Sequence, residues 1–407
     1  MPGIALLENP VQEYAWGSRD FIPRLLGNPS PSETPQAELW MGAHPMGTSR
    51  VLWEGRWLLL SEAIQKDPRG ILGESVSARF SDKLPFLFKV LAASKPLSIQ
   101  AHPNRSQAVQ GFGKENGRGI PLNAPHRNYR DPSHKPEILC ALTPFWALKG
   151  FRPMDEIRFL LHRTGVPASE LPRLQEEGES GLRKLLSDLL TMSRERQRHL
   201  ISIAVSAARG HTSSDPVFEW IVRLQQAFPY DVGVLGPVLL NLIHLKPGEA
   251  LSIGPGELHS YLDGAGVEVM ANSDNVLRGG LTEKHIDRQE LLKVVNFSPS
   301  ASRILPAVVQ GAAEWLYTSG AEEFLLSRIS LEHGVLYESP VERSVEIMIC
   351  VKGEVEVTDV GRGEKLRLLR GSSILVPAFV KAYRMTGEGT LYKSTVPQAG
   401  YPDPHAS

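Results

Sequence analysis

The apolar and polar positions of this chain follow two different periods. Over residues 1–152 and 230–407, short runs of alternating apolar and polar side chains are separated by clusters of Gly, Pro, Asn and Asp. A period of two is typical of strands with one buried face, and closely spaced turn signals favour antiparallel sheets of the jelly-roll kind. Residues 247–256 illustrate this pattern, and residues 345–376 predict a second unit of the same type.

The period changes to that of a helix between residues 155 and 228. Five leucines recur at i, i+3, i+4, i+7 and i+8: Leu182, Leu185, Leu186, Leu189 and Leu190. This spacing puts them on one face of an amphipathic helix. Pro153 and Pro229 bracket the segment, and strand-like runs lie on both sides of it. We therefore predict a helical insertion into a β domain.

These patterns together predict a mainly β chain with an α insertion. The expected domains are a β domain assembled from 1–152 and 230–300, a helical domain at 153–229, and a second β domain at 301–407. The two β domains share a weak repeat. Pro255 is followed at the fourth and sixth positions by His259 and Tyr261, whereas Pro377 is followed at these positions by Lys381 and Tyr383. Because an ammonium group has no lone pair for a cation, the second β domain is expected to bind no metal and to carry no chemistry.

Bulk composition excludes several classes of partner. The 407 residues carry a formal net charge of −1 with 42% hydrophobic residues, so neither nucleic acid nor an anionic membrane is expected as a partner. The first 20 residues show no signal-peptide pattern, and no run reaches the roughly 18 apolar residues of a membrane span. Cys140 and Cys350 both lie in apolar runs, which favours buried free thiols. We expect a cytoplasmic monomer.

Three of the alternating segments carry groups that bind metals. Ser98, Gln100 and His102 fall on one face of the first segment. Glu137 and His259 fall on the polar faces of two others. A single histidine of this kind would most simply belong to a solvated strand face. Two histidines with a carboxylate instead predict a site for zinc or another first-row divalent ion, with a position left open for substrate.

Five stretches resemble the type I phosphomannose isomerases of the cupin superfamily. They are Tyr14-Ala15-Trp16-Gly17, residues 37–45, residues 98–103, His134-Lys135-Pro136-Glu137 and residues 256–287. The similarity extends to about Asn296 and is weak in the helical middle and the last hundred residues. It implies two cupin-type jelly-roll units, and an enzyme that interconverts mannose 6-phosphate and fructose 6-phosphate with one zinc ion (Zn²⁺) per chain.

The resemblance also implies a fourth metal ligand. It gives the ligand set as Gln100, His102, Glu137 and His259. Spacing alone leaves His44 and His134 as rivals of Gln100, because an amide oxygen is a poor zinc ligand beside imidazole or carboxylate.

Aldose–ketose isomerisation moves a proton between adjacent carbons through a cis-enediol, and this requires a base and a group that stabilises negative charge. Arg278 matches a position that the family treats as catalytic, and a guanidinium that stays protonated suits charge stabilisation. Lys135 and His134 adjoin Glu137 and are candidates for proton transfer or ring opening. Glu268 and Asp274 are the other candidate bases.

Substrate contacts are expected from residues without a dedicated phosphate loop. Lys89, Ser98, Arg278 and Lys284 are the candidate phosphate contacts, and Trp16 is a candidate contact for the sugar. Arg105 is a further cation in the same stretch. The alternatives are a cupin-type metal-dependent oxygenase, which uses the same ligand types, and a non-catalytic sugar-phosphate-binding protein.

Overall fold

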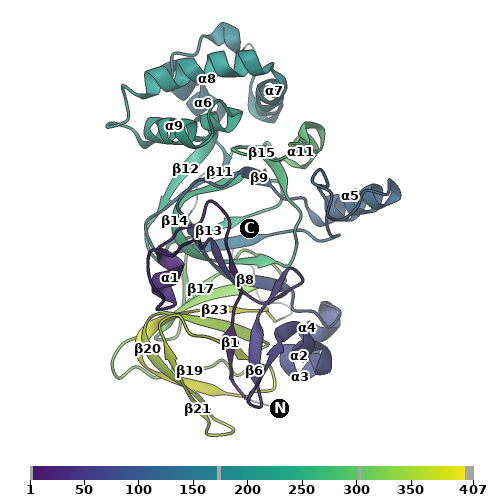
Figure 1. Cartoon of the computed structure of the whole chain (residues 1–407), viewed down its shortest axis with the longest axis vertical. Helices are drawn as coiled ribbons and strands as arrows, with labels where there is room; N and C mark the ends of the chain where they lie inside the picture. Colours follow the sequence, from purple (N-terminus) through teal and green to yellow (C-terminus); the bar gives the residue numbers. More distant parts are fainter. Residues whose placement is uncertain (1–2, 172–175, 301–303, 399–407) are drawn as a thin grey trace.

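A computed structural model describes residues 3–171, 176–300 and 304–398 of the chain (Figure 1). Two large antiparallel sheets form the body of the molecule, and most of the long helices gather at one end. The prediction of a mainly β fold with helical segments is confirmed.

The larger sheet has 11 strands, in the order β16-β17-β18-β23-β20-β22-β1-β6-β7, with β19 paired to β23 and β21 to β20. Its members are β1 (Ala5–Glu8), β6 (Arg50–Trp53), β7 (Arg56–Leu59), β16 (Val308–Gln310), β17 (Glu314–Tyr317), β18 (Leu325–Leu331), β19 (Tyr337–Glu338), β20 (Glu346–Asp359), β21 (Lys365–Leu369), β22 (Ser373–Val376) and β23 (Tyr383–Thr395).

The first strand of the chain completes the sheet formed by its last strands. β1 runs antiparallel to β22, with Ala5 opposite Leu375. The expected β domain 1–152 therefore gives β1, β6 and β7 to the sheet of the expected domain 301–407. Pairing between segments so far apart leaves no trace in a local pattern, because each strand shows only its own alternation. The division into domains stays a prediction, and residues 301–303 at one of its limits lie outside the described residues.

The second sheet has ten strands, with the path β12-β11-β14-β8-β3-β2 and β9, β10, β13 and β15 attached to it. Its members are β2 (Val11–Gln12), β3 (Glu38–Met41), β8 (Phe86–Ala93), β9 (Ile99–Ala101), β10 (Glu137–Ala141), β11 (Phe145–Phe151), β12 (Leu240–Leu245), β13 (Ala250–Ile253), β14 (His259–Ala271) and β15 (Leu277–Gly280); β4 (Ala43–His44) and β5 (Gly47–Thr48) form a separate pair.

Strand β8 lies at the centre of this second sheet. All eight of its side chains are buried, and it is paired along its length with β14. The sequence of β8 is apolar except at Lys89, which lies directly opposite Glu268 of β14. An ion pair in the middle of a buried strand costs desolvation energy that an apolar pair would avoid. Its position therefore indicates the wall of a site.

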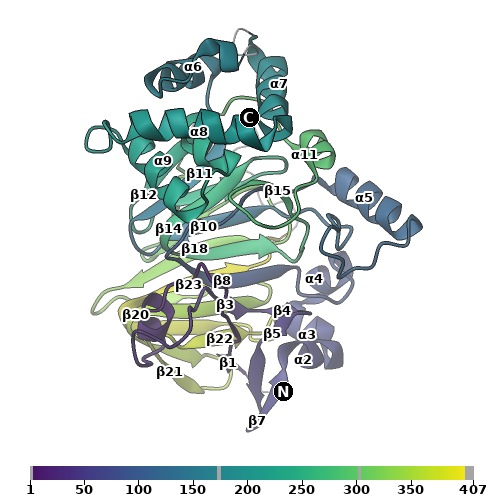
Figure 2. The same cartoon turned by 45° about the horizontal axis from the view of Figure 1, so that its top comes forward.

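Four long helices cover one end of this sheet (Figure 2). They are α6 (Met154–Arg163), α7 (Gly178–Thr191), α8 (Arg194–Ala208) and α9 (Pro216–Ala227), with the short η1 (Ala168–Glu170) after α6. The five leucines of the predicted stripe are all buried in α7. They share one apolar cluster with Leu148 of β11 and Leu240 of β12. The helical unit is thus packed directly on β11 and β12, the strands that precede and follow it in the chain.

The remaining helices are short, apart from α5. They are α1 (Phe21–Leu25), α2 (Leu60–Lys66), α3 (Pro68–Leu72), α4 (Glu74–Arg79), α5 (Arg105–Gly117), η3 (Val232–Leu235), α10 (Gly236–Leu239) and α11 (Arg288–Val294). A reciprocal capping box between Asn104 and Gln107 begins α5. Within the described residues, no helix is long and apolar enough to span a membrane. Cys140 and Cys350 are buried free thiols, as predicted.

The weak repeat falls on corresponding long strands of the two sheets. Tyr261 lies near the start of β14, and Tyr383 begins β23. Lys381, which takes the place of His259, is exposed just before β23. This part of the chain has two histidines. His333 is exposed in a turn, and His405 lies outside the described residues.

Candidate metal centre and active site

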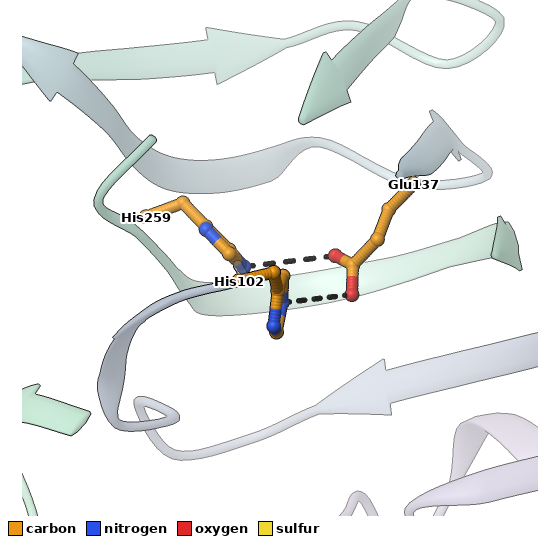
Figure 3. A group of neighbouring side chains, drawn as sticks. All are labelled: His102, Glu137 and His259. Carbon is orange, nitrogen blue, oxygen red and sulfur yellow. Dashed lines mark ion pairs between the residues drawn. The ribbon is translucent and has the colours of Figure 1, made fainter. Parts of the chain in front are cut away.

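Three segments of the second sheet bring His102, Glu137 and His259 together (Figure 3). His102 follows β9, Glu137 begins β10 and His259 begins β14. The Nε2 atom of His102 is 3.1 Å from one carboxylate oxygen of Glu137, and the Nε2 atom of His259 is 3.6 Å from the other. The candidate ligand atoms all lie within 4.8 Å of one another. The three residues predicted from alternation therefore form one cluster.

The hydrogen bonds of both histidines leave one nitrogen of each ring free for a metal. The Nδ1 atom of His102 is 2.7 Å from the carbonyl oxygen of Asn275, and that of His259 is 2.9 Å from the carbonyl oxygen of Glu257. A carbonyl only accepts, so Nδ1 carries the proton and Nε2 keeps a lone pair. Both Nε2 atoms are buried without a hydrogen-bond partner. This arrangement fits zinc.

Burial and neighbouring charges set the required protonation states. Burial lowers the pKa of His259 to about 4, and burial with the charge of Lys135 lowers the pKa of His102. Burial alone would raise the pKa of Glu137, but Lys135 and the two histidines hold it well below its ordinary range. Neutral imidazoles and an ionised carboxylate are the forms that bind zinc without first losing a proton.

A turn at Gly256 and the buried Asn275 hold the ligand segments. The backbone N–H of Gly256 donates to the carbonyl oxygen of His102 at 2.8 Å. Gly256 has φ +74°, and a Cβ there would lie 2.6 Å from the carbonyl oxygen of Val294, so only glycine fits. The side chain of Asn275 accepts from the backbone N–H groups of Arg130 and Asp131, while its backbone carbonyl orients His102.

Gln100 lies beside the cluster on the short strand β9. It is directly opposite His259 of β14 on one side and Arg278 of β15 on the other. Side chains at directly opposite positions of neighbouring strands share a face of the sheet. The two rivals lie elsewhere: His44 is paired with Asp274 at 3.4 Å, and His134 with Glu323 at 2.7 Å. The position of Gln100 agrees with a fourth ligand, and the assignment stays a prediction.

Among the candidate catalytic groups, Lys135 directly contacts the metal-binding cluster. Its Nζ atom is 3.1 Å from the Oε1 atom of Glu137, and its side chain is 10% exposed. Tyr261 lies on the other side of the same carboxylate, to which its hydroxyl donates at 3.2 Å. The sequence analysis gave Tyr261 no role at this site.

Glu268 and Lys89 form the wall behind Tyr261. They are buried and 3.0 Å apart, and a second carboxylate, Glu38, is 3.6 Å from the Nζ atom of Lys89. Burial would lower the pKa of Lys89, but Glu268 and Glu38 raise it above its ordinary value. The charge of Lys89 is thus paired with two carboxylates and shielded from solvent, and its contact with phosphate stays a prediction. Burial raises the pKa of Glu268 although the charge of Lys89 lowers it, and its role as a base stays a prediction.

Asp274 accepts a hydrogen bond from His44, a contact that spacing gave no means to predict. Burial would raise its pKa, but this hydrogen bond and the charges of His44, Lys135 and Arg130 lower it. Asp274 is thus a carboxylate of reduced basicity that lies between the lysine at the metal cluster and a cation further along the site.

Arg278, Lys284 and Arg130 form a group of cations next to Asp274. Burial and the charge of Arg130 lower the pKa of Arg278, and burial with the charges of the two arginines lowers the pKa of Lys284. Over the described residues, none of the three is within 4.0 Å of a carboxylate. Cations that repel one another and have no direct ion-pair partner favour an anionic ligand. Sequence reasoning missed Arg130, although its place four residues before His134 was a usable signal.

Comparison with known proteins agrees with this site. The family model of the type I phosphomannose isomerase catalytic domain matches residues 4–154. Mannose-6-phosphate isomerase of Salmonella typhimurium is 40% identical over 95% of this chain and 97% of its own length, and that of Homo sapiens is 34% identical over 93% and 94%. The chain belongs to the type I phosphomannose isomerase family.

Solved structures of the family share the whole fold. The Salmonella typhimurium mannose 6-phosphate isomerase bound to its substrate and zinc superposes with a TM-score of 0.89 at 38% identity, covering 98% of this chain and 100% of that one. A zinc-bound holo mannose 6-phosphate isomerase gives the same TM-score, identity and coverage. The resemblance inferred from five sequence stretches is confirmed.

The remaining predicted contacts lie at the edges of the site. Ser98 directly precedes β9 and is half-buried. Trp16 is half-buried and stacks on Tyr14 with 5.8 Å between ring centroids. Arg105 pairs with Glu323 at 3.0 Å and with Glu322 at 3.7 Å. Arg105 is thus engaged by two carboxylates, whereas the roles of Ser98 and Trp16 stay predictions.

Proposed function

We propose that this chain interconverts mannose 6-phosphate and fructose 6-phosphate with one zinc ion held by His102, Glu137, His259 and Gln100. One observation carries the proposal. Two buried imidazole nitrogens without hydrogen-bond partners face a buried carboxylate. A group of cations without direct ion-pair partners among the described residues lies in the same site. A metal-binding end and an anion-binding end are what a sugar phosphate requires.

The register of three strands sets the separation of the two ends. Gln100 of β9 lies between His259 of β14 and Arg278 of β15. Neighbouring strands are about 4.8 Å apart, so the backbones that carry His259 and Arg278 are separated by roughly 10 Å. We place the reacting carbons between the metal ligands and Arg278, and the phosphate near Lys284 and Arg130.

The reaction moves a proton between C1 and C2 through a cis-enediol. When bound, zinc supplies a Lewis acid that polarises the carbonyl and orients the two reacting oxygens. The guanidinium of Arg278 stays charged at neutral pH and stabilises the negative charge that develops on those oxygens. Lys284 and Arg130 hold the phosphate, so that most of the binding energy is independent of the chemical step.

Lys135 is the group to which we assign the proton transfer. It directly contacts the ligand Glu137. The three other candidates are paired with groups outside the metal cluster: Glu268 with Lys89, Asp274 with His44 and His134 with Glu323. We assign His134, next to Lys135 in the chain, to opening the sugar ring, a step that also needs a proton donor and acceptor.

A coupled isomerase assay on mannose 6-phosphate, before and after chelation, tests the proposal. Turnover in the absence of oxygen, lost on chelation and restored by zinc, is the expected result. Turnover only with oxygen would favour the cupin-type oxygenase, and tight binding without turnover would favour a non-catalytic sugar-phosphate-binding protein. We further propose a cytoplasmic monomer, which size-exclusion chromatography with light scattering and cell fractionation can test.

A further inference from the structure

A carboxylate from the second β unit reaches the segments that carry two of the metal ligands. Glu323 lies in the loop between β17 and β18, at the end next to β18. Its Oε1 atom is 2.7 Å from the Nε2 atom of His134 and 3.0 Å from a guanidinium nitrogen of Arg105. His134 precedes the ligand Glu137 by three residues, and Arg105 follows the ligand His102 by three. One carboxylate oxygen thus links both segments.

The loop that carries Glu323 is itself held in place. Arg79 of α4 donates one hydrogen bond to the carbonyl oxygen of Glu322 and another to that of Pro397. Glu323 is 6% exposed, so its contact with His134 is shielded from water. Burial would raise the pKa of Glu323, but the hydrogen bond and charge of His134, together with Arg105, lower it. The carboxylate is therefore an ionised acceptor in a fixed place.

We propose that Glu323 is a positioning residue, supplied by the second β unit, that orients His134 for its part in the isomerisation. The Nε2 atom of His134 also lies 3.3 Å from a guanidinium nitrogen of Arg105, which can only donate, but the shorter 2.7 Å contact with Glu323 assigns the proton to Nε2. The carboxylate then accepts the Nε2–H and fixes the ring, which leaves Nδ1 as its free nitrogen. This inference rests on the proposed function only for the step that His134 assists. It also changes the expectation that the second β unit has no part in the chemistry, since that unit would set the orientation of a catalytic side chain.

The central experiment compares Glu323→Gln with Glu322→Gln in the zinc-loaded protein. Glutamine has the shape of glutamate but no charge, and its amide cannot satisfy both donors as the carboxylate does. Glu323→Gln should lower kcat about tenfold or more, the scale for outer-shell partners, with KM and zinc content nearly unchanged. Glu322 is the matched control, because it is the adjacent residue, 64% exposed and 3.7 Å from the same Arg105. Its variant should behave as wild type.

A double-mutant cycle shows whether Glu323 acts through His134. His134→Gln should lower kcat, and adding Glu323→Gln to it should cause no further loss. Three results would each overturn the proposal. The losses of kcat could multiply in the double variant, His134→Gln could leave kcat unchanged, or Glu323→Gln could lose stability but keep its kcat. If Glu323→Gln does not fold, Glu323→Asp keeps the charge but withdraws it by one methylene, and should give a smaller loss of kcat that also vanishes in the His134→Gln background.

A spectroscopic readout separates this inference from the proposed function. The imidazole Nε2–H of His134, held by a buried carboxylate, should give an NMR signal protected from exchange in wild type and Glu322→Gln and absent in Glu323→Gln. A wild-type protein that does not isomerise mannose 6-phosphate would overturn the proposed function, while this signal would still decide the contact. Loss of the protected signal in Glu322→Gln as well, or its survival in Glu323→Gln, would overturn the positioning role.

Discussion

The two β units each bury a group of charged side chains, but only one of them leaves lone pairs free. In the metal cluster, the Nε2 atoms of His102 and His259 face Glu137 without a hydrogen-bond partner. In the second unit, Lys393 lies 2.7 Å from Glu314 and 3.8 Å from Glu346. Burial and charge alone do not distinguish these two groups. The difference is that the metal cluster has acceptor atoms without a hydrogen-bond partner.

The second group, here named the Lys393 cluster (Lys393, Glu314, Glu346 and Arg343), satisfies itself. Arg343 pairs with Glu346 at 3.1 Å, and the hydroxyl of Tyr337 donates to Glu314 at 2.9 Å. The two cations balance the two carboxylates and occupy their oxygens, so the cluster offers a metal ion no free ligand. A buried charged cluster is therefore a candidate site only when its acceptors exceed the donors around them.

Removing a ligand or the metal should have the largest effect on activity. Glu137→Ala and His259→Ala should lose the bound zinc and nearly all turnover, a loss exceeding the roughly 100-fold typical of outer-shell changes. Gln100→Ala should weaken metal retention less than Glu137→Ala does, because the amide is neutral. Elemental analysis alongside the isomerase assay checks both. A fully active His259→Ala protein would show that the unpartnered nitrogens do not mark a metal site.

Lys135 and Lys393 are both paired with buried glutamates, so they can be compared directly. Lys135→Met should lower kcat by about 10²-fold or more, the scale of general acid–base catalysis. Deuterium at C2 of the substrate should in turn exchange partly with solvent in the wild-type reaction. Complete transfer to C1 without washout would exclude the enediol, and near-normal turnover of Lys135→Met would move the base to Asp274, Glu268 or His134.

Arg278 is expected to act on the transition state more than on the bound substrate. Arg278→Lys keeps the charge but loses the planar guanidinium, and should lower kcat by roughly 10²-fold with a smaller change in KM. Steady-state kinetics on mannose 6-phosphate give both constants. A change confined to KM would instead make Arg278 a phosphate contact like Lys284.

Lys393→Met should reduce stability and spare the chemistry. It leaves Glu314 without its cation in a buried place, which should lower the free energy of unfolding by about 3–5 kcal/mol. Lys365→Met is the matched control, since Lys365 also lies 2.7 Å from a glutamate, Glu356, but is 62% exposed. Its loss should stay below about 1 kcal/mol. Denaturant titration measures both, and equal losses would contradict the distinction drawn from burial.

Lys381→Ala should have the smallest effect of all. Lys381 takes the place of His259 in the repeat and is exposed. Metal content should stay at one ion per chain and kcat should be unchanged, because no metal or substrate group reaches it. A second tightly bound metal in the wild-type protein, lost on mutation in the second β unit, would refute the comparison.

Local patterns predicted the elements of the site better than their connections. The alternation around His102, Glu137 and His259 was enough to propose the metal cluster, because a strand fixes which side chains share a face. Five leucines likewise predicted the buried stripe of α7. By contrast, the same reasoning did not predict the ion pair of Lys89 and gave Tyr261 no role. Lys89 is paired with Glu268, which is far from it in the chain and opposite it in the sheet, and Tyr261 contacts Glu137 of another strand.

The sequence by itself determined the strand and helix periods, the identity of the metal-binding residue types and the membership of the family. Tertiary structure decided which charges are compensated: Lys89 by Glu268 and Glu38, and His134 by Glu323 of the second β unit. It also decided that β1 completes the sheet of the last strands. The physical reason is the range of the forces. Periodicity is a property of neighbours along the chain, whereas ion pairs and strand pairing join residues that only folding brings within a few ångströms.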